Sequence, residues 1–329
     1  MNPTDKVKIG ATDLLVTRMG MGGAVLGGLY HEVSDEAARK SVEAACSRGI
    51  NFFDTAPLYG HGRSEERMGG FLRTLPRSSF VLSTKVGRVL VPANSTKVES
   101  VIFENPAPFE PVFDFSYDGV MRSFEESLKR LKLDRIDVLL IHDPDDHYQD
   151  ALRGAYPALH KLHSQGAVKA IGAGMNQAEM LACFAREGDF DCFLLAGRYT
   201  LIDHSGLKEL LPLCEQKNIS IIIGGPYNSG ILAGGQVSGA KFNYQEASAE
   251  IVSKVRRVEE VCRRHSVSLK AAALQFPLAH PAVASVIPGA RSAAEVEENF
   301  ALMTVPIPSD FWKDLKAEEL LPDAAPVPE

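Results

Sequence analysis

The sequence has few cysteines, and none of them are paired at a spacing typical of metal sites or disulfide frameworks. The five cysteines are scattered along the chain, with no CxxC pair: Cys46, Cys183, Cys192, Cys214 and Cys262. Structural zinc sites and small disulfide scaffolds depend on closely spaced cysteines. Neither His160 with His163 nor His142 with His147 has further ligands at matching spacing. The pattern predicts reduced thiols, no metal site and a cytoplasmic location.

The sequence also lacks long apolar runs and basic runs. No stretch is long enough to span a membrane, and no charged-then-apolar signal stands at the N-terminus. The formal net charge is −7 at pH 7, which disfavours a nucleic acid as partner. We therefore expect a small-molecule substrate and neither a membrane nor a nucleic acid as partner. The oligomeric state is left open.

A third absence concerns the phosphate-binding fingerprint of doubly wound dinucleotide-binding folds. Residues 20–23 follow an apolar run and contain three glycines, but the spacing is wrong and no helix is predicted to begin there. The doubly wound alternative is therefore weakly supported.

What the chain does contain is a regular alternation of short apolar runs and helical stretches. The strand candidates are residues 18–23, 50–53, 80–84, 137–141, 168–172, 192–196, 219–223 and 283–287. The helix candidates are residues 35–48, 64–73, 117–131, 150–164, 177–186, 205–217, 249–279 with a break, and 292–300. Eight strands alternating with helices over this length predict an α/β fold of the (β/α)8 TIM-barrel type. We expect one domain over residues 1–320 and a mobile tail over 321–329.

The composition of two connecting segments predicts a specific structure or position for each of them. Residues 7–16 read as a small hairpin with polar turn residues. Residues 86–116 form a long connection rich in proline and aromatic residues, and long loops in compact domains are usually functional. We expect this connection to lie over a substrate pocket.

Titratable residues stand at the ends of three predicted strands. Asp54 and Tyr59 follow the second strand, Lys85 ends the third, and His142 ends the fourth. Barrels place their chemistry at the carboxyl ends of the strands. Tyr59 is the candidate general acid and base, and a neighbouring Lys85 ammonium would lower the pKa of its phenol. Asp54 would hold Lys85, and His142 would fix the substrate oxygen. Such a set moves one proton in a carbonyl–alcohol conversion, so a nicotinamide cofactor is implied for the hydride.

At these four residues the chain resembles the aldo-keto reductase family, in which the matching residues form the catalytic tetrad. Further segments resemble a bacterial branch that contains D-threo-aldose (L-fucose) 1-dehydrogenases and pyridoxal 4-dehydrogenase: residues 26–30, 59–65, 114–123 and 141–145. The resemblance implies that the N-terminal hairpin plugs the barrel. The substrate contacts expected in this branch are Tyr30, Tyr59, His142 and Asp143.

The resemblance also implies a cofactor site. The expected contacts are Gly22, Gly23, Asp54, Asn176, Gly225, Pro226, Tyr227, Ser229, Gly230, Gly289, Arg291, Glu295 and Asn299. Glu295 occupies a position where many NADPH-dependent relatives carry Arg or Gln. A carboxylate there accepts a hydrogen bond from a ribose hydroxyl and repels a 2′-phosphate, which favours NAD. Arg291 could reach such a phosphate, so NADP stays open as an alternative.

Three positions depart from the family pattern at the nicotinamide end. The usual Ser-Asn after the fifth strand is Gly174-Met175, followed by Asn176. Ala196 replaces the usual Gln, and Gly224 replaces the usual Tyr that stacks on the nicotinamide.

The expected activity is that of an oxidoreductase that acts on CH–OH groups. A hydride would pass from a cyclic hemiacetal, such as L-fucose or D-arabinose, to NAD to give a lactone, with Tyr59 as base. Three alternatives stay open: a pyridoxal 4-dehydrogenase that forms 4-pyridoxolactone, a general NADPH-dependent aldehyde reductase, and a slow nicotinamide-sensing binding protein on the same fold.

Overall fold

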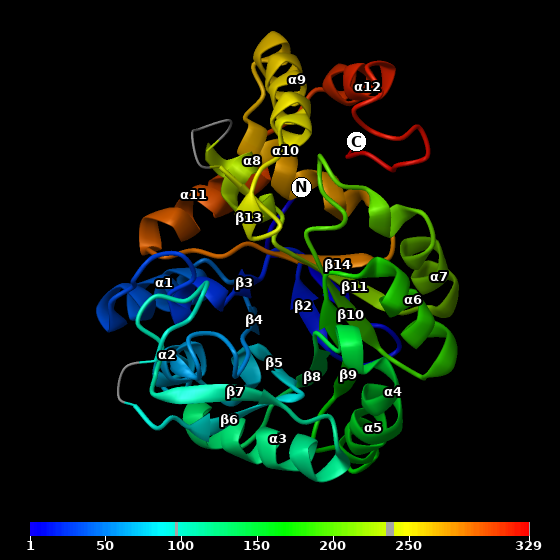
Figure 1. Ribbon diagram of the computed structural model, residues 1–329. Coiled ribbons are helices and arrows are strands. Elements are labelled where there is room, and N and C mark those ends of the chain that lie inside the picture. Colours follow the sequence, from blue (N-terminus) through cyan, green and yellow to red (C-terminus); the bar gives the residue numbers. More distant parts are fainter. Residues whose placement is uncertain (96–97, 235–239, 329) are drawn as a thin grey trace.

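A closed parallel barrel organises the molecule (Figure 1). The computed structural model describes residues 1–95, 98–234 and 240–328. Within them, eight strands form one parallel sheet: β3 (Met21–Gly22), β4 (Phe52–Asp54), β5 (Val81–Val86), β8 (Val138–His142), β9 (Ala170–Met175), β10 (Cys192–Ala196), β11 (Ser220–Gly224) and β14 (Val283–Ile287). Parallel bridges from Met19 to Val286 and from Gly22 to Gly289 join the first and last strands. The eight apolar runs correspond to these strands, and the (β/α)8 prediction is confirmed.

Helices surround the barrel and cover the outer faces of its strands. The longer ones are α1 (Asp35–Ser47), α2 (Arg63–Leu72), α3 (Tyr117–Leu131), α5 (Tyr156–Ser164), α6 (Ala178–Glu187), α7 (Leu210–Lys217), α9 (Ala249–His265), α10 (Leu269–Gln275), α11 (Ala293–Thr304) and α12 (Ser309–Ala317). The short helices α4 (Tyr148–Asp150) and α8 (Ile231–Gly234) complete the set, and a π-helical turn over Ala151–Ala155 joins α4 to α5. The Ser34 hydroxyl accepts a hydrogen bond from the Ala37 N–H at 3.2 Å and caps the start of α1. Helix α12 was not predicted.

None of the helices among the described residues combines the length and the apolar run that crossing a membrane requires.

The N-terminal hairpin closes one end of the barrel. Strands β1 (Lys6–Lys8) and β2 (Leu15–Thr17) pair antiparallel. Ile9 and Val16 are fully buried and pack with inward-facing residues such as Phe52, Val138 and Ile222. The Gly10 N–H also donates to the Ser220 hydroxyl at the start of β11. The hairpin is therefore the plug that the family resemblance implies.

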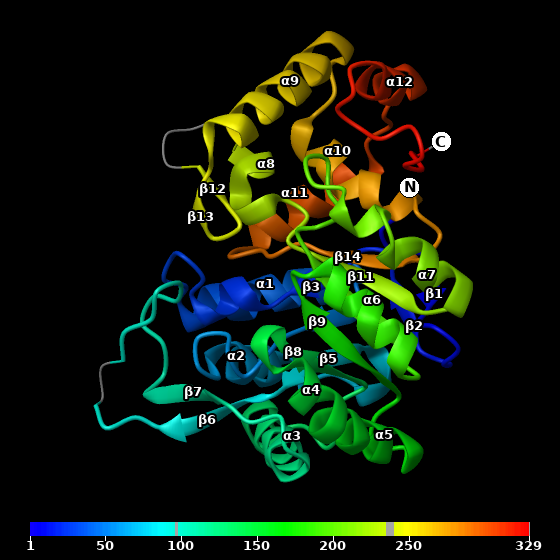
Figure 2. The same ribbon diagram turned by 45° about the vertical axis from the view of Figure 1, so that its right-hand side comes forward.

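The opposite end of the barrel carries two further hairpins, as Figure 2 shows. One is β6 (Arg88–Pro92) with β7 (Phe109–Phe113), and the other is β12 (Lys241–Phe242) with β13 (Gln245–Glu246). The first lies inside the connection 86–116, which we had expected to be a loop without strands. Cross-strand pairs such as Arg88 with Phe113 give it regular structure.

The C-terminal segment is partly packed against the domain. Leu321 and Ala325 are buried and belong to the main core cluster, and the Lys316 ammonium donates to the Asp323 carbonyl. Burial of these side chains ties part of the segment to the core, and the mobility of residues 321–329 stays a prediction.

Candidate active site

Three of the four expected catalytic residues project into the barrel from adjacent strands. Asp54 and His142 end β4 and β8, and Lys85 is the penultimate residue of β5. Alternate residues of a strand share one face, so Phe52 and Asp54 point inward together, as do Leu140 and His142. The apolar members fill the barrel, and the polar members form its last layer at the carboxyl end.

Tyr59 reaches the same layer from the turn after β4. Its backbone is held by a close approach of two glycine-containing turns, since a Cβ atom on Gly60 would lie 2.3 Å from the Gly27 carbonyl oxygen. Gly60 also has a φ of 61°, which favours glycine. The Tyr59 and His142 rings meet edge to face with centroids 5.7 Å apart.

Lys85 and Asp54 form a buried ion pair beneath Tyr59. The Lys85 ammonium donates to Asp54 Oδ2 at 2.7 Å and to the Thr55 carbonyl at 2.8 Å, and both side chains are almost completely buried. The Lys85 Nζ also lies 4.7 Å from the centroid of the Tyr59 ring. The structure thus brings all four tetrad residues together.

The electrostatics of Tyr59 differ from our expectation. We expected Lys85 to lower the pKa of the phenol. Burial instead raises the pKa of Tyr59 well above its ordinary value, and the Asp54 and Asp143 carboxylates add to this effect. The Arg88 cation opposes this rise. Lys85 is paired with Asp54, and this carboxylate offsets part of the effect of the ammonium on the phenol.

His142 is held in its neutral form. Burial lowers its pKa well below the ordinary value, and the Lys85 and Arg88 cations lower it further. A neutral imidazole carries one N–H donor and can form a hydrogen bond with a substrate oxygen without a net charge.

A cavity of about 620 Å³ opens above the tetrad. Tyr59, Lys85, His142, Asp143 and Asn176 all line it. Residues 98–103 of the long connection also form part of its wall, which agrees with the expected position of that segment over a substrate pocket. The Asn176 amide donates to the Ala196 carbonyl at 2.8 Å, so this side chain is fixed at the cavity wall despite the altered motif before it.

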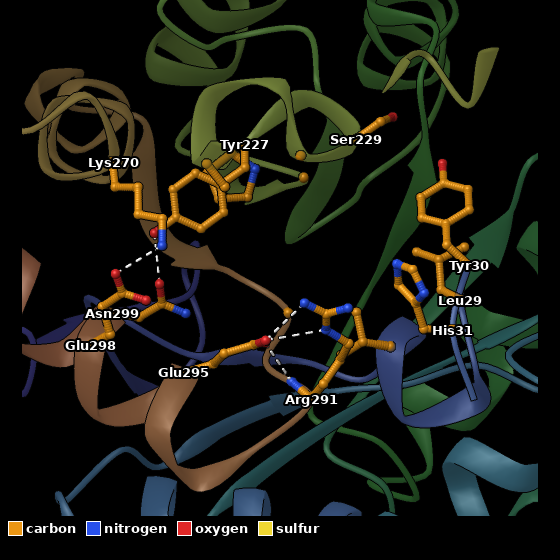
Figure 3. Close-up of a pocket in the computed structure, with 16 residues that line it drawn as sticks. Leu29, Tyr30, His31, Tyr227, Ser229, Lys270, Arg291, Glu295, Glu298 and Asn299 are labelled. Atoms are coloured by element: carbon orange, nitrogen blue, oxygen red, sulfur yellow. Dashed lines mark hydrogen bonds and ion pairs between the residues drawn. The ribbon is translucent and has the colours of Figure 1, made fainter. Parts of the chain in front are cut away.

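A second cavity of about 360 Å³ lies beside the N-terminal end of α11 (Figure 3). Ten expected site residues line it: Tyr30, Gly225, Pro226, Tyr227, Ser229, Gly230, Gly289, Arg291, Glu295 and Asn299. The Tyr227 hydroxyl donates to Asn299 Oδ1 at 2.6 Å, and Asn299 is buried. Leu29 lines both cavities, so they share a wall.

The cations of the second cavity are each paired with a carboxylate of α11. Arg291 donates to Glu295 Oε1 through Nη2 at 2.9 Å and Nε at 3.1 Å, and its backbone N–H donates to Glu295 Oε2. Lys270 donates to Glu298 Oε1 at 2.8 Å (Figure 3). Both pairs are partly exposed, so their charges are compensated without being buried.

Four expected contacts lie in other places. Asp54, which was also expected at the cofactor, lines neither cavity, and its carboxylate is buried against Lys85. Tyr30, expected at the substrate, lines the second cavity and not the one above the tetrad. Gly22 and Gly23 line neither cavity, and their backbone N–H groups donate to the Pro288 and Asp54 carbonyls at the barrel seam. Their role as cofactor contacts stays a prediction.

Sequence reasoning missed several residues of the two cavities. Arg88, His61 and Tyr244 line the tetrad cavity, and Lys270 and His31 line the second one. His61 lies in the segment 59–65 that resembles the bacterial branch, although it was not singled out there. The composition of the connection 86–116 indicated that segment without identifying Arg88.

The residues of the two cavities fit a dinucleotide. The second cavity combines a fixed amide at Asn299 with glycines at 225 and 230, both in the left-handed backbone region. A Cβ atom on Gly230 would meet no atom within 4 Å, so this backbone borders open space that a ligand can approach. The Asn176 amide lies in the other cavity, beside the tetrad. Gly225, Gly230, Asn299 and Asn176 would hold the two ends of such a group.

Fold and site together define a (β/α)8 barrel whose Tyr59, Lys85 and His142 could act on a substrate oxygen in the cavity above them. Comparison with known proteins agrees: the model of the aldo/keto reductase family matches residues 18–319. The chain is 39% identical to pyridoxal 4-dehydrogenase from Microbacterium luteolum, over 98% of this chain and 99% of that protein. It is also 39% identical to D-threo-aldose 1-dehydrogenase from a Pseudomonas species, over 95% of this chain and 97% of that protein.

Solved structures show the same fold. An aldo-keto reductase from Bacillus halodurans in its holo form superposes with a TM-score of 0.77 at 23% identity, covering 99% of this chain and 98% of that one. The chain belongs to the aldo/keto reductase family. Enzymes of this family use nicotinamide cofactors.

Proposed function

We propose that the protein oxidises the cyclic hemiacetal form of an aldose, such as L-fucose or D-arabinose, to a lactone with NAD as the oxidant. The observation that carries the proposal is the position of Tyr59, between the Lys85–Asp54 pair and the neutral His142 at the base of one cavity. The wall of that cavity is mostly apolar, and its polar side chains, which include Arg88, Glu99 and Asp143, can form hydrogen bonds with the hydroxyl groups of a sugar.

The tetrad residues have distinct roles in this reaction. A nicotinamide held near Asn176 would supply the hydride acceptor for the hydrogen of the hemiacetal carbon. The neutral His142 imidazole holds the reacting oxygen by a hydrogen bond, and the Tyr59 oxygen removes the hydroxyl proton. Lys85, fixed by Asp54, stabilises the phenolate that this step requires.

The charge balance of the second cavity supports NAD over NADP. A 2′-phosphate would need an uncompensated cation, whereas Arg291 and Lys270 are already paired with Glu295 and Glu298. A phosphate would have to displace a carboxylate from either cation. The hydroxyls of an unphosphorylated ribose can instead donate to these carboxylates.

Oxidation of pyridoxal to 4-pyridoxolactone is the second candidate. It is favoured by the 39% identity to pyridoxal 4-dehydrogenase over nearly the full length of both chains. Pyridoxal also forms a cyclic hemiacetal, so the same proton transfer by Tyr59 applies. A general NADPH-dependent aldehyde reductase and a slow nicotinamide-sensing protein remain alternatives that an assay can separate.

A substrate panel tests the proposal. Steady-state rates are measured for L-fucose, D-arabinose and pyridoxal with NAD and NADP, and for a simple aldehyde with NADH and NADPH. We expect the highest kcat/KM for an aldose with NAD. A higher value for pyridoxal would select the second candidate. Efficient reduction of the simple aldehyde with NADPH alone would select the reductase, and cofactor binding with negligible turnover of every compound would select the sensor.

A further inference from the structure

Arg88 is held rigidly in the wall of the tetrad cavity. Its Nη2 donates to Asp143 Oδ2 at 3.0 Å, and its guanidinium carbon lies 4.4 Å from the centroid of the Phe113 ring. Both Arg88 and Asp143 line the cavity, with side-chain exposures of 20% and 25%. Ion pairing on one side and stacking on the other fix the guanidinium next to the catalytic residues.

The backbone of Asp143 adopts a strained conformation. Its φ is 43°, in the left-handed region that residues other than glycine rarely adopt. This conformation brings Asp143 Oδ2 to 3.5 Å from Nε2 of the neighbouring His142. Strained residues that persist at a cavity often serve the function of the site. Here the strain places a carboxylate directly beside the imidazole that holds the reacting oxygen.

The pair retains unused hydrogen-bonding capacity toward the cavity. Arg88 lines the cavity, and its hydrogen bond to Asp143 uses Nη2, which leaves Nη1 as a donor. The hydrogen bond and the close contact of the Asp143 carboxylate within the described chain both use Oδ2, which leaves Oδ1 as an acceptor. A donor and an acceptor side by side match a hydroxyl group, which both accepts and donates.

We propose that Arg88 and Asp143 form a subsite for the hydroxyl on the carbon adjacent to the reacting carbon. Asp143 Oδ1 accepts a hydrogen bond from that hydroxyl, and Arg88 Nη1 donates to its oxygen. The subsite selects 2-hydroxy carbonyl compounds and their cyclic hemiacetals. It therefore favours aldoses over pyridoxal, whose hydroxyl is one carbon farther from the reacting carbon. This inference rests on the proposed function only in placing the reacting oxygen at Tyr59 and His142.

Matched substrates that differ by this one hydroxyl test the subsite. In the reductive direction, lactaldehyde and propanal are compared with NADH and with NADPH. In the oxidative direction, D-arabinose and 2-deoxy-D-ribose are compared with NAD. We expect kcat/KM to favour the hydroxylated member of each pair by roughly 10- to 100-fold, the factor that a hydrogen bond to a charged group contributes.

Variants assign the preference to the two residues. Asp143→Asn preserves shape and tolerates the left-handed backbone, and Arg88→Met removes the guanidinium. Each weakens one of the two hydrogen bonds and should therefore lower the preference by at least about threefold, and Arg88→Lys should restore part of what Arg88→Met loses. The matched control is Arg122→Met, which breaks an ion pair of the same 3.0 Å length between Arg122 and Asp114, outside both cavities. It should keep the wild-type preference.

The outcomes separate this inference from the proposed function. A wild-type preference below threefold in both directions would overturn the subsite, and this measurement needs no variant to fold. A wild-type preference that survives in both Asp143→Asn and Arg88→Met would overturn it as well. If neither an aldose nor pyridoxal is oxidised but lactaldehyde is preferred over propanal, the proposed function fails and the subsite stands.

Discussion

At the scale of single residues, Tyr59 is the group on which the chemistry depends. It lies above a compensated Lys85–Asp54 pair and beside a neutral imidazole. Burial keeps its phenol protonated in the free enzyme, because the pKa is raised well above the ordinary value. The resting residue is therefore ready to donate a proton in reduction and must first lose one in oxidation.

Replacement of Tyr59 by phenylalanine should abolish turnover and leave cofactor affinity nearly unchanged. The phenol supplies the proton transfer, and loss of a positioned acid or base typically costs about 10²- to 10⁴-fold in rate. The measurements are kcat and the dissociation constant of NADH by fluorescence titration. Tyr199→Phe is the control, since Tyr199 is fully buried and lines neither cavity. More than a tenth of wild-type kcat in Tyr59→Phe would remove Tyr59 from the mechanism.

The oxidation rate should rise with pH across the alkaline range. Below the raised pKa of Tyr59, each pH unit increases the phenolate fraction about tenfold. The logarithm of kcat/KM should then increase with a slope approaching one. The titration of His142 should not change kcat/KM above pH 7, because its lowered pKa keeps the imidazole neutral there.

The same pH profile tests the role of Lys85. Lys85→Met removes the cation that stabilises the phenolate, so the rising limb should move to higher pH and the rate should fall. Thermal unfolding by circular dichroism must show that the variant is folded, since the change leaves Asp54 buried without its partner. A residual activity with an unshifted profile would contradict this role.

At the scale of secondary-structure elements, the hairpin β6–β7 begins directly after the strand that carries Lys85. Only Gly87 separates the end of β5 from Arg88, the first residue of β6. Gly87 has a φ of 99° and makes the turn from β5 into β6. A Cβ atom there would lie 2.2 Å from Phe115 Cε1. The hairpin can therefore follow Lys85 so closely only with glycine at this position.

Gly87→Ala should destabilise the protein by about 2–4 kcal/mol, the sum of backbone strain and a steric clash. Gly166→Ala is the matched control, since Gly166 has a φ of 73° but no atom within 4 Å of the added Cβ. It should show the strain alone, about 1–2 kcal/mol. Urea unfolding measures both variants. Equal losses of unfolding free energy would show that the Phe115 contact imposes no constraint.

Helix α11 is the element that should set the cofactor preference. It carries Glu295, Glu298 and Asn299 on the side that lines the second cavity. A charge pair about 4 Å apart contributes up to about 4 kcal/mol at an effective dielectric constant of 20, and solvent reduces this value. Since about 1.4 kcal/mol corresponds to a tenfold ratio, we expect kcat/KM to favour NAD at least tenfold.

Glu295→Gln should narrow that preference, because it removes the repulsion of the 2′-phosphate and releases Arg291. The control is Glu297→Gln, an identical change on the same helix. Glu297 pairs with Arg48 and lines neither cavity. A wild-type preference for NADP would mean that Arg291 governs the site in spite of its carboxylate partner.

At the scale of the whole molecule, stability and chemistry lie at opposite ends of the barrel. The plug closes the end where the strands begin, and both cavities lie toward the end where the strands terminate. The buried core of the barrel lies between the plug and the cavities, so stability and catalysis depend on different ends of the barrel. Changes in the plug should therefore affect unfolding far more than catalysis.

Ile9→Ala should lower the free energy of unfolding by about 2–5 kcal/mol, the range for truncation of a buried aliphatic side chain. Turnover at 25 °C should be nearly unchanged, because Ile9 lines neither cavity. Leu15→Ala on the same hairpin is the control, since Leu15 is 45% exposed and should cost little. The measurements are urea unfolding and kcat. A substantial loss of kcat in folded Ile9→Ala would link the plug to the site.

The local sequence was sufficient for the barrel and its tetrad, because both follow from short-range patterns. Each barrel strand is buried on both faces and reads as an apolar run, and alternation along the strand directs Asp54 and His142 inward. Tyr59 follows in the next turn. The family resemblance then added most residues of the second cavity, including Glu295 and Asn299.

Only the tertiary structure identified Arg88, Tyr244 and Lys270 as parts of the site and reversed the expected pKa shift of Tyr59. These residues come from connecting segments, whose positions depend on contacts between distant parts of the chain, such as Arg88 with Asp143. The shift depends on burial and on the sum of several charges. The positions of the connecting segments and the pKa of Tyr59 are therefore properties of the packed molecule. The residues adjacent to Tyr59 in the sequence do not determine them.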